Sequence, residues 1–407
     1  MNSATREVVL RRPGWVIPGA SCDIHFADNR AWALGSSGLT NLLACSRAST
    51  KYAQTKSGLL APFAANQMAI TDQGCLIEQA STNLLLHSND VGGWITANST
   101  RAGALVLGPD NTVSAIPFQR SSTASAYSAQ TVSKAASSLV YTLSVFAKAN
   151  TGRYLALTIS GTPSPQGRAD ATFDLQTGAV SLGPTVSNGF TAQSASITPA
   201  ANGFFQCTLT ATSDAYMTIT CYYSFNSNNV RLDGVDSSAA SSGWTWNLQL
   251  EQNAVDTSPI ITTTAAVTRA ADAITLRGAA LTAALMAEAA YFETASVPAA
   301  GRLLNGGTGR LLISGLSTLA ITMDGVSFPS AGFAGTVEGF VRSAFGWNGA
   351  TVSVVANGGT KGSGSSPGTL SASVYVGSQG GSALSLNGYM RRLALGSIFG
   401  QFDGKTA

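Results

Sequence analysis

The sequence predicts an all-β chain made of tandem antiparallel β-sandwiches of the jelly-roll kind, preceded by an irregular N-terminal segment. Charged residues make up 11% of the 407 residues, against about 25% in ordinary globular proteins. Surface helices normally carry such charges, so their scarcity disfavours helices. Apolar residues make up 44%, which excludes the composition typical of disorder. Short segments that alternate apolar and polar residues recur along the chain, as half-buried strands do.

The middle region, residues 84–258, has the clearest strand pattern and predicts one sandwich. Apolar residues alternate in each of several segments, and Thr177-Gly178 is a hairpin turn between two of them. No helical pattern separates these strands, which favours an antiparallel sheet pair. The segments are Ser138–Lys148, Arg153–Ser160, Phe173–Val180, Phe205–Ala211, Met217–Tyr223 and Trp244–Leu250.

Residues 272–407 predict a second sandwich, with a short helical stretch at Ala279–Ala290 before its strands. Glycine-rich turns, including Asn305–Gly307 and Asn357–Gly359, have the Asn-Gly chemistry that hairpins prefer. Residues 259–271, with Pro259 and a threonine run, are expected to be a linker. Residues 1–83 lack periodicity, and we expect them to be an anchoring segment that docks on a partner.

Composition also excludes several functions. The net charge of +3 is spread thinly, so nucleic-acid binding is not expected. No apolar run approaches the roughly 20 residues of a membrane span, so membrane insertion is not expected. The N-terminus lacks the apolar core of a signal peptide. We therefore expect synthesis in a bacterial cytoplasm and release by lysis. Five cysteines without a signal peptide argue against a disulfide framework, and Cys207 and Cys221 are expected in the core.

Motifs at the two ends of the middle region resemble the entry and exit segments of a module common in phage head and tail proteins. The entry segment ITDQGCLIEQASTNLLLHSND has Glu78, Thr82-Asn83 and Ser88, and Trp94 follows it. The exit segment WNLQLEQNAVDTSPIITTTAAVTRAAD ends at Asp272, and YTLSVFAKA (Tyr141–Ala149) matches an internal strand. The resemblance covers residues 22–272 and implies a carbohydrate-binding-module-like jelly roll.

The third region resembles the concanavalin-A-like, laminin-G-like sandwich that often follows this module. The matching pieces are AYFETASVP (Ala290–Pro298), FGWNGATVSVVANG (Phe345–Gly358) and LNGYMRRLALG (Leu386–Gly396). Both families are associated with sugars. The resemblance therefore implies a virion protein, a tail fibre or a head spike of a phage or of a gene-transfer-agent-like particle, that contacts host capsule or other surface polysaccharide.

Catalysis is not expected. A glycosidase needs two carboxylates across a cleft, and most of the 20 acidic residues lie in turns or linkers. Glu78 and Glu251 belong to the framing motifs, where a structural hydrogen bond is the simpler role. Cys22 and His25 have ligand-like spacing without the second pair that zinc needs. No cofactor is expected, although Asp233 and Asp236 in an Asn/Asp-rich loop are candidate Ca²⁺ ligands; the simpler interpretation is an ordinary turn.

Sugar binding combines aromatic faces with planar polar groups, and six residues are candidates. Each also has a structural interpretation. Trp94 could close the end of the sandwich, whereas Tyr222 lies on the strand face opposite Met217, Ile219 and Cys221. Trp347 stands beside a turn and is expected to be exposed; Trp246, by contrast, is expected in the core. The candidates are Trp94, Tyr127, Tyr222 and Arg231 in the middle region and Trp347 and Asn348 in the last.

Three functions remain open at this point. The first is a virion fibre or spike that binds host polysaccharide for adsorption. The second is a purely architectural capsid or tail decoration protein, and the third, less favoured, is a polysaccharide depolymerase. For the first, we expect a homo-oligomer, because several weak sites together give useful affinity. We also expect contact with other virion proteins through the N-terminal segment.

Overall fold

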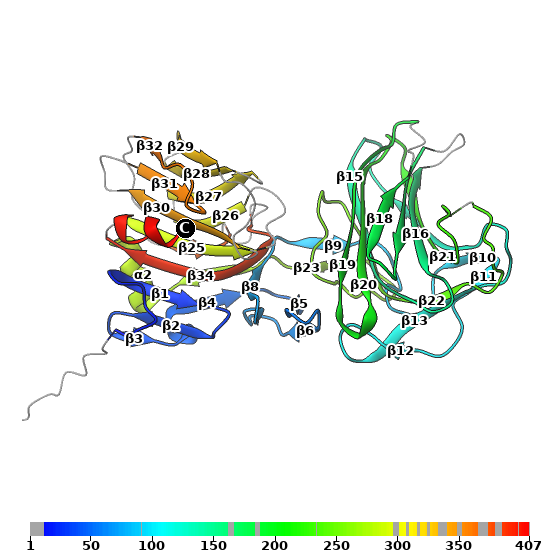
Figure 1. The fold of residues 1–407 in the computed structure, drawn as a ribbon, viewed down its shortest axis with the longest axis horizontal. Helices are drawn as coiled ribbons and strands as arrows, with labels where there is room; N and C mark the ends of the chain where they lie inside the picture. The colour runs from blue at the N-terminus through cyan, green and yellow to red at the C-terminus, as the bar shows by residue number, and fades with distance from the viewer. Residues whose placement is uncertain are drawn as a thin grey trace, which may run out of the picture. The chain divides into compact units, whose positions relative to one another are not determined.

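The fold is all-β with antiparallel sheets, as the sequence predicts (Figure 1). The computed structural model describes residues 12–90, 92–161, 167–183, 188–232, 234–295, 301–306, 309–315, 318–323, 326–332, 340–347, 352–364, 373–378, 385–397 and 399–406. The chain divides into two compact units. Unit 1 comprises Met1–Ala53, Phe63–Ala80 and Ala270–Ala407, and unit 2 comprises Gln54–Pro62 and Ser81–Arg269.

Unit 2 is a sandwich of two sheets. We call them the front sheet, with strand order β10-β14-β21-β16-β17-β18, and the back sheet, with order β11-β13-β22-β15-β20-β19 and β12 on β13. The front strands are β10 (Ile95–Ala97), β14 (Tyr127–Ser133), β21 (Thr218–Asn226), β16 (Tyr154–Gly161), β17 (Arg168–Asp174) and β18 (Ala179–Leu182). The back strands are β11 (Ser99–Thr100), β12 (Val106–Leu107), β13 (Val113–Arg120), β22 (Ser242–Glu251), β15 (Val140–Ala149), β20 (Phe205–Thr212) and β19 (Thr191–Pro199), with the short helix η1 (Ala201–Gly203) before β20.

The alternation in these strands fills one core between the two sheets. Leu155, Leu157 and Ile159 of β16 meet Leu143 and Val145 of β15 in this core. Cys207 and Cys221 are also buried there, as expected, and burial raises the pKa of both thiols. The alternate residues of the front sheet point away from the core. They create the polar face on which the candidate site lies.

Unit 1 is built on two further sheets, which we call the long sheet and the short sheet. The long sheet has the order β3 (Ser36–Ser37), β2 (Arg30–Ala33), β1 (Ala20–His25), β34 (Gly388–Gly396), β25 (Ala289–Ala295), β30 (Val341–Trp347), β31 (Val352–Ala356) and β32 (Gly362–Gly364), with β8 (Gly74–Ile77) on β34 and β7 (Ile70–Thr71) on β8. The short sheet has the order β29 (Val326–Gly332), β28 (Thr318–Met323), β27 (Gly309–Gly315), β26 (Gly301–Gly306), β33 (Val374–Val376), β24 (Ala273–Leu276) and β4 (Leu43–Ser46).

The remaining elements are helices α1 (Leu39–Leu42), α2 (Gly278–Leu285), η2 (Phe399–Gln401) and η3 (Asp403–Lys405), and the strand pairs β5 (Lys51–Gln54) with β6 (Leu60–Phe63) and β9 (Ser81–Asn83) with β23 (Val267–Arg269).

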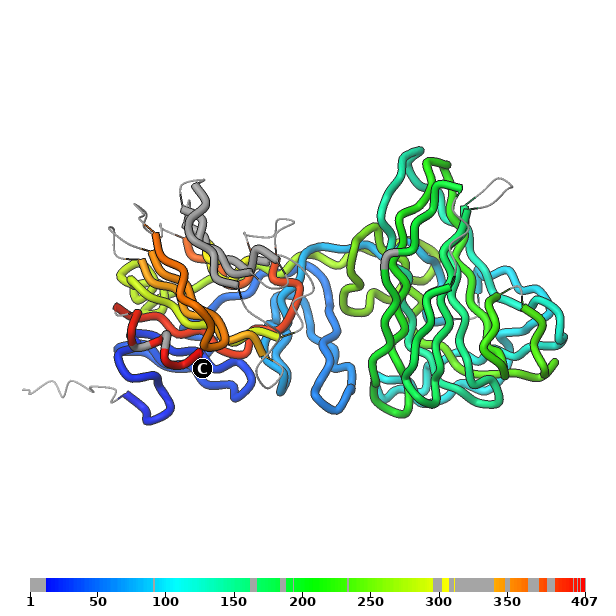
Figure 2. Tube along the Cα trace, turned by 45° about the horizontal axis from the view of Figure 1, so that its top comes forward, coloured from blue at the N-terminus to red at the C-terminus, as the bar shows by residue number. Residues whose placement is uncertain are grey.

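The structure corrects the expectation that residues 1–83 are a separate, irregular docking segment. β1 pairs with β34 and β4 pairs with β24, so N-terminal and C-terminal strands share both sheets of unit 1. Figure 1 shows blue β1 beside red β34, and Figure 2 shows blue and red segments within the same unit. In each of these pairs, the two strands are more than 200 residues apart in the sequence. Local periodicity could therefore not reveal the pairing.

The expected linker, residues 259–271, is also different in the structure. Ile260 and Thr262 are buried within unit 2, and β23 pairs with β9. The Ile260 N–H donates to Gln249 Oε1 at 2.7 Å. The exit segment is therefore part of the folded unit. The sequence also predicts a strand at Val337–Val341, of which residues 337–339 lie outside the described residues.

The residues of the resembling motifs are structural. In unit 1, the buried carboxylate of Asp272 accepts hydrogen bonds from Arg47 at 2.7 Å, from Lys51 at 2.5 Å and from the Glu78 N–H at 2.9 Å. Lys51 also pairs with the Glu78 carboxylate at 3.0 Å. All four residues are at most 5% exposed. The network joins the segments on either side of unit 2 in the sequence.

A second network lies inside unit 2, around Asn83. Its side-chain N–H groups donate to the carbonyls of Leu248 and Ile260, and its Oδ1 accepts from the N–H groups of Leu85 and Leu250. All four hydrogen-bonding positions of the buried amide are used. This explains why an asparagine, and not another polar residue, occupies this motif position.

Candidate functional site

The outward face of the front sheet carries a row of side chains from four neighbouring strands. Ala129 of β14 is opposite Tyr222 of β21, Tyr222 is opposite Thr158 of β16, and Thr158 is opposite Asp170 of β17. Directly opposed residues point to the same side of a sheet. The row therefore joins an aromatic ring, a hydroxyl and a carboxylate on one face, which we call the tyrosine face.

Two sequence-predicted candidates, Tyr127 and Tyr222, form an aromatic pair on this face. Their ring centroids are 5.2 Å apart and the rings meet at 84°, an edge-to-face arrangement. Both side chains are half-buried. Burial, with a contribution from Tyr127, raises the pKa of Tyr222, although a hydrogen bond with Thr220 opposes the shift. The hydroxyl therefore stays protonated at neutral pH and can donate as well as accept.

Asp170 is the buried charge of the tyrosine face. It is 2% exposed, and its Oδ1 accepts a hydrogen bond from the Thr158 hydroxyl at 2.6 Å. Its Oδ2 lies 3.0 Å from Arg168 Nε and 3.6 Å from a terminal nitrogen of Arg231. The sequence predicted Arg231 as a site residue but missed Asp170 and Arg168. Alternation along β17 places both on the outward face, but nothing in the sequence shows that β17 lies near Arg231.

The loop between β21 and β22 brings Arg231 to this face. Asp236 anchors the loop, because its carboxylate accepts hydrogen bonds from the Ser227 N–H at 2.9 Å, the Ser227 hydroxyl at 2.6 Å and the Ser241 hydroxyl at 2.6 Å. Burial alone would raise the pKa of Asp236, but these hydrogen bonds and nearby Arg120 outweigh it and lower the pKa.

Because Asp236 anchors the loop through hydrogen bonds, an acidic residue at this position has a structural role that does not require Ca²⁺. Asp233, the other candidate ligand, lies outside the described residues. Among the described residues, no group of three or more His, Cys, Asp or Glu side chains is placed to hold a metal ion. The oxygens of Asp236 are already engaged by N–H and O–H donors, which favours the ordinary turn over the ion site.

Trp94 has a structural place at the edge of the unit 2 core. Its ring packs edge-to-face against Tyr223 at 5.6 Å, and its Nε1 donates to the His87 carbonyl at 3.1 Å. The Arg101 guanidinium lies 5.1 Å from the ring centroid. These contacts engage both the polar edge and the face of the ring. They fit the interpretation that Trp94 closes the sandwich better than a role in sugar binding.

The expectation that Trp347 is exposed is wrong. Trp347 is the last residue of β30 and is 4% exposed within the core of unit 1, where it lies among Phe345, Val352 and Val354. β30 extends as far as Trp347, so the alternation that buries Phe345 also buries the tryptophan. Asn348 lies outside the described residues. Of the candidates, Tyr127 and Tyr222 contact each other, and Arg231 lies near Asp170 on the same sheet face.

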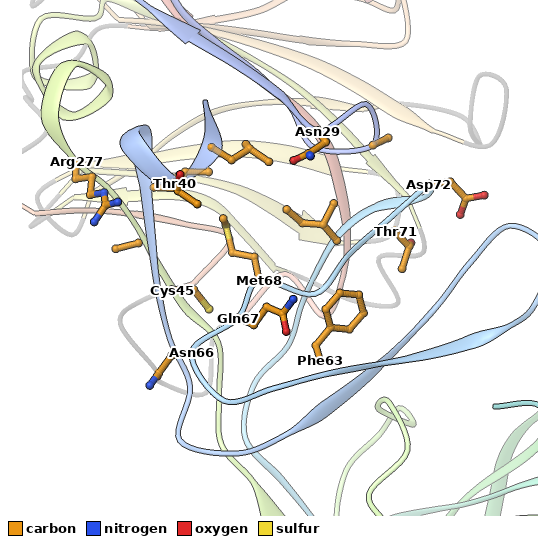
Figure 3. A pocket seen from close by; sticks show the side chains of 15 residues that line it. Asn29, Thr40, Cys45, Phe63, Asn66, Gln67, Met68, Thr71, Asp72 and Arg277 are labelled. Atoms are coloured by element: carbon orange, nitrogen blue, oxygen red, sulfur yellow. The ribbon is translucent and has the colours of Figure 1, made fainter. Parts of the chain in front are cut away.

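Unit 1 contains a pocket of about 800 Å³ that sequence reasoning missed. Figure 3 shows Met68 and Gln67 near its middle, with Arg277, Asn29 and Asp72 around them. Its volume and its mixture of apolar and polar groups are typical of small-molecule sites. The lining comes from segments far apart in the sequence, and no local motif marks it. The other lining residues are Ala27, Leu39, Thr40, Leu43, Ala44, Cys45, Phe63, Asn66, Ile70 and Thr71.

The carboxylates of the tyrosine face do not have glycosidase geometry. Asp170 and Asp174 both lie on β17, and four residues along a strand span about 13 Å. Glycosidase pairs are about 5 to 9.5 Å apart. Asp174 is held by Arg153 through two hydrogen bonds, at 2.9 and 2.5 Å. Arg153 is the main cause of the lowered pKa of Asp174, so Asp174 is poorly suited to act as an acid.

No protein-family model matches the chain, and no curated protein matches it either. Among solved structures, the chain is similar to the mouse laminin alpha1 chain, domains LG4-5, with 12% sequence identity and a TM-score of 0.22, over 75% of this chain and 94% of that one. The fold assignment therefore rests on the sheets described above. In the described part of the chain, no helix is long and apolar enough to cross a membrane.

Proposed function

We propose that the protein is a virion fibre or spike subunit that binds host surface polysaccharide through the tyrosine face, without cleaving it. The observation that carries the proposal is that the Tyr127–Tyr222 pair and the Arg231–Asp170 ion pair lie on the same outward face of the front sheet. The sequence predicts Tyr127, Tyr222 and Arg231 as candidate sugar-binding residues, and they come from β14, β21 and the loop that follows β21. Their meeting on one sheet face supports a common role.

The chemistry of the face suits a saccharide. The C–H face of a pyranose packs on an aromatic ring, and its hydroxyls pair with planar polar groups. Tyr222 supplies the ring and Arg231 the planar donor group. The Tyr127 ring, in edge-to-face contact with Tyr222, limits the positions that the Tyr222 ring can take. A rigid aromatic platform binds with less loss of conformational freedom than a mobile one.

The virion role is supported by the ordered motifs that resemble the phage head and tail module. Attachment to other virion proteins, expected of a separate N-terminal segment, would then fall to a folded unit, because β1 and β4 belong to unit 1. We propose a homo-oligomer, since repeated weak sites on one particle give avidity. A purely architectural role remains the alternative, and a binding measurement separates the two.

The test is binding of the full-length protein and of Tyr222→Ala to surface polysaccharides purified from candidate hosts. We expect saturable binding by the parent protein and a loss of about tenfold or more for Tyr222→Ala, the usual effect of removing a central aromatic contact. The length of the polymer is measured in the same samples and is expected to stay constant.

Tyr216→Ala is the matched control, because Tyr216 is 45% exposed and belongs to the same unit but not to the tyrosine face. Its affinity should equal that of the parent. Equal losses for Tyr216→Ala and Tyr222→Ala would place the site elsewhere. Absence of binding to every host polysaccharide would favour the architectural role, and shortened polymer would mean that the protein is a depolymerase.

A further inference from the structure

We infer that the pocket of unit 1 is a docking site for an extended peptide segment of another protein. The segment pairs with the outer edge of β4 and brings an acidic side chain to Arg277. The inference goes beyond the proposed binding of a glycan and does not depend on it, because the pocket and the tyrosine face belong to different units.

β4 is the outermost strand of the short sheet, and its hydrogen bonds show which backbone groups face away from β24. The Arg277 N–H donates to the Leu42 carbonyl at 2.9 Å, in register with the pairing of β4 and β24. Hydrogen-bonded pairs alternate along an antiparallel ladder. Ala44 and Ser46 therefore direct their N–H and C=O groups toward β24, and Cys45 directs its groups toward the outer edge.

The outer edge of β4 is closed at one end and open at Cys45. Beyond the strand, the Arg47 N–H donates to Asn66 Oδ1 at 3.0 Å, and the Arg47 carbonyl accepts from the Asn66 N–H at 2.9 Å. In the part of the chain that the structure describes, no group bonds to the Cys45 N–H and C=O or to the Leu43 C=O on this edge. Unpaired backbone groups at a sheet edge are a template for another strand.

The pocket lies along this edge. Leu43, Ala44 and Cys45 of β4 line it, and residues 66–68, which follow the closed end of the edge, line it as well. Figure 3 shows Cys45 and Met68 among the lining side chains. A volume of about 800 Å³ is in the range of sites for small ligands. The pocket therefore suits a short extended segment rather than a folded domain, and added strands are a known mode of peptide recognition.

The geometry gives one apolar side chain of the peptide a defined place. Directly opposed residues of paired strands point to the same side of a sheet. A peptide residue opposite Cys45 therefore directs its side chain to the side on which Cys45, Met68 and Ile70 pack against the core of unit 1. Met68 and Ile70 are partly exposed, so an apolar side chain at this place removes apolar surface from water.

Arg277 determines the charge of the partner. It lines the pocket and is exposed, and its guanidinium has no hydrogen bond or ion pair with the residues that the structure describes. Asp72, the other charged residue of the described lining, is already engaged. A guanidinium pairs well with a carboxylate. Because Arg277 is opposite Leu42, three residues from Cys45, the acidic residue is expected about 10 Å, or about three positions, from the apolar one.

The experiment uses the full-length protein and a library of blocked synthetic hexapeptides. Each peptide has one leucine and one aspartate about three positions apart, in either order, and varied Thr, Val and Ser at the other positions. We expect a subset to bind saturably in fluorescence anisotropy. Hydrogen exchange resolved to single amides should then show new protection of the Cys45 N–H, whereas the Ala44 N–H, directed to β24, exchanges slowly throughout. If no hexapeptide binds, or if a bound one leaves exchange at Cys45 unchanged, the inference is overturned.

N-methylated forms of the best binder test the backbone pairing. N-methylation of the peptide residue opposite Cys45 removes the donor to the Cys45 carbonyl and should lower affinity by about tenfold. N-methylation of the next residue, whose N–H points away from β4, should leave affinity unchanged. Equal affinities of the two forms would show that side chains alone hold the peptide, which contradicts the pairing.

Arg277→Gln tests the place of the acidic residue. This variant should lose about tenfold in affinity for the aspartate peptide and bind its asparagine counterpart as the parent does, because a charge-assisted hydrogen bond is removed. Arg30→Gln is the matched control, since Arg30 is exposed in unit 1 but does not line the pocket. Equal losses in the two variants would indicate bulk attraction and exclude a specific contact with Arg277. Polysaccharide binding by both should equal that of the parent, so this inference and the proposed function fail separately.

Discussion

Asp272 shows how one side chain can hold together segments that are distant in sequence. Its carboxylate receives hydrogen bonds from Arg47, Lys51 and the Glu78 N–H. The side chains of Arg47 and Lys51 are 0% exposed, so solvent does not screen these pairs. A buried charge that loses its partner is costly, because the protein no longer compensates for its removal from water.

We therefore expect Asp272→Ala to destabilise unit 1 by about 3 to 5 kcal/mol, the usual cost of breaking a buried ion pair. Chemical denaturation of the full-length protein, followed by hydrogen exchange of peptides from each unit, measures this free energy. Peptides of unit 2 should keep their protection, since Asp272 contacts groups of unit 1.

Asp28→Ala is the control for this change. Asp28 is hydrogen-bonded to His25 at 3.1 Å, and its side chain is 46% exposed. Burial lowers the pKa of His25, so the imidazole is neutral at pH 7, and even a charged pair at an exposed position contributes little. Its removal should shift the free energy of unfolding by less than about 1 kcal/mol. A comparable loss of unfolding free energy in the two variants would show that the buried network stabilises unit 1 no more than the exposed contact does.

At the scale of an element, the loop between β21 and β22 is fixed by hydrogen bonds to Asp236. Because the folded-state pKa of Asp236 lies below its ordinary value of 3.8, the ionised form is preferred in the folded state. Its contribution to stability is then complete above pH 3.8 and is lost as the pH falls through the lowered pKa.

We expect Asp236→Asn to reduce the stability of unit 2 at neutral pH and to remove this part of the acid sensitivity. Ca²⁺ or EDTA should leave the Tm of the parent unchanged, because a ligand that does not bind the folded state cannot stabilise it. Thermal unfolding between pH 3 and 7, with and without Ca²⁺, tests both points. A rise in Tm with Ca²⁺ that Asp236→Asn abolishes would mean that the loop is an ion site.

The strands of unit 2 could be predicted because their alternation is local, but one residue shows the limit of that signal. Trp246 was expected in the core because it alternates with Leu248 and Leu250. It is indeed 1% exposed, but Asn247 has a φ of 49° and the register shifts there. The resulting bulge turns Trp246 to the other face of the back sheet, against Phe146. The prediction of burial is right, and its reason is wrong.

The tyrosine face was predictable in part for a related reason. Strand alternation alone places the Tyr222 side chain outside the core, because Ile219, Cys221 and Tyr223 are on the opposite face. The meeting of Arg231 with Asp170 depends on a loop that folds back over a strand. No repeat in the sequence encodes that contact, so the partner of Arg231 could come only from the structure.

At the scale of the whole molecule, the sequence gives no local sign that unit 2 is inserted into unit 1. The pairing of β1 with β34 joins residues that are more than 360 positions apart. β34 can be recognised as a strand from its own sequence, but nothing in the sequence of β1 or β34 specifies that the two strands pair. The N-terminal segment cannot be recognised as part of a sheet from its own sequence, because its partner strands β24 and β34 come much later in the chain.

This arrangement predicts the outcome of a truncation after Arg269. The shortened chain lacks β34 and β24, so β1 and β4 lose their partners in the long and short sheets. It also lacks Asp272, which leaves Arg47 and Lys51 without the carboxylate they share. We expect residues 12–53 and 63–80 to unfold in this variant.

Limited trypsin digestion tests whether these residues unfold, because Arg47 and Lys51 are each 1% exposed in the intact chain. Cleavage after both should be slow in the full-length protein and fast in the truncated one, since a protease acts on unfolded segments. The core of unit 2 is complete without residues 270–407, so hydrogen exchange of β15 and β16 should be unchanged. If Arg47 and Lys51 stay protected after truncation, the N-terminal segments fold without the C-terminal strands. Residues 1–83 would then be the separate anchoring domain that the sequence predicts, and the division into two units would be incorrect.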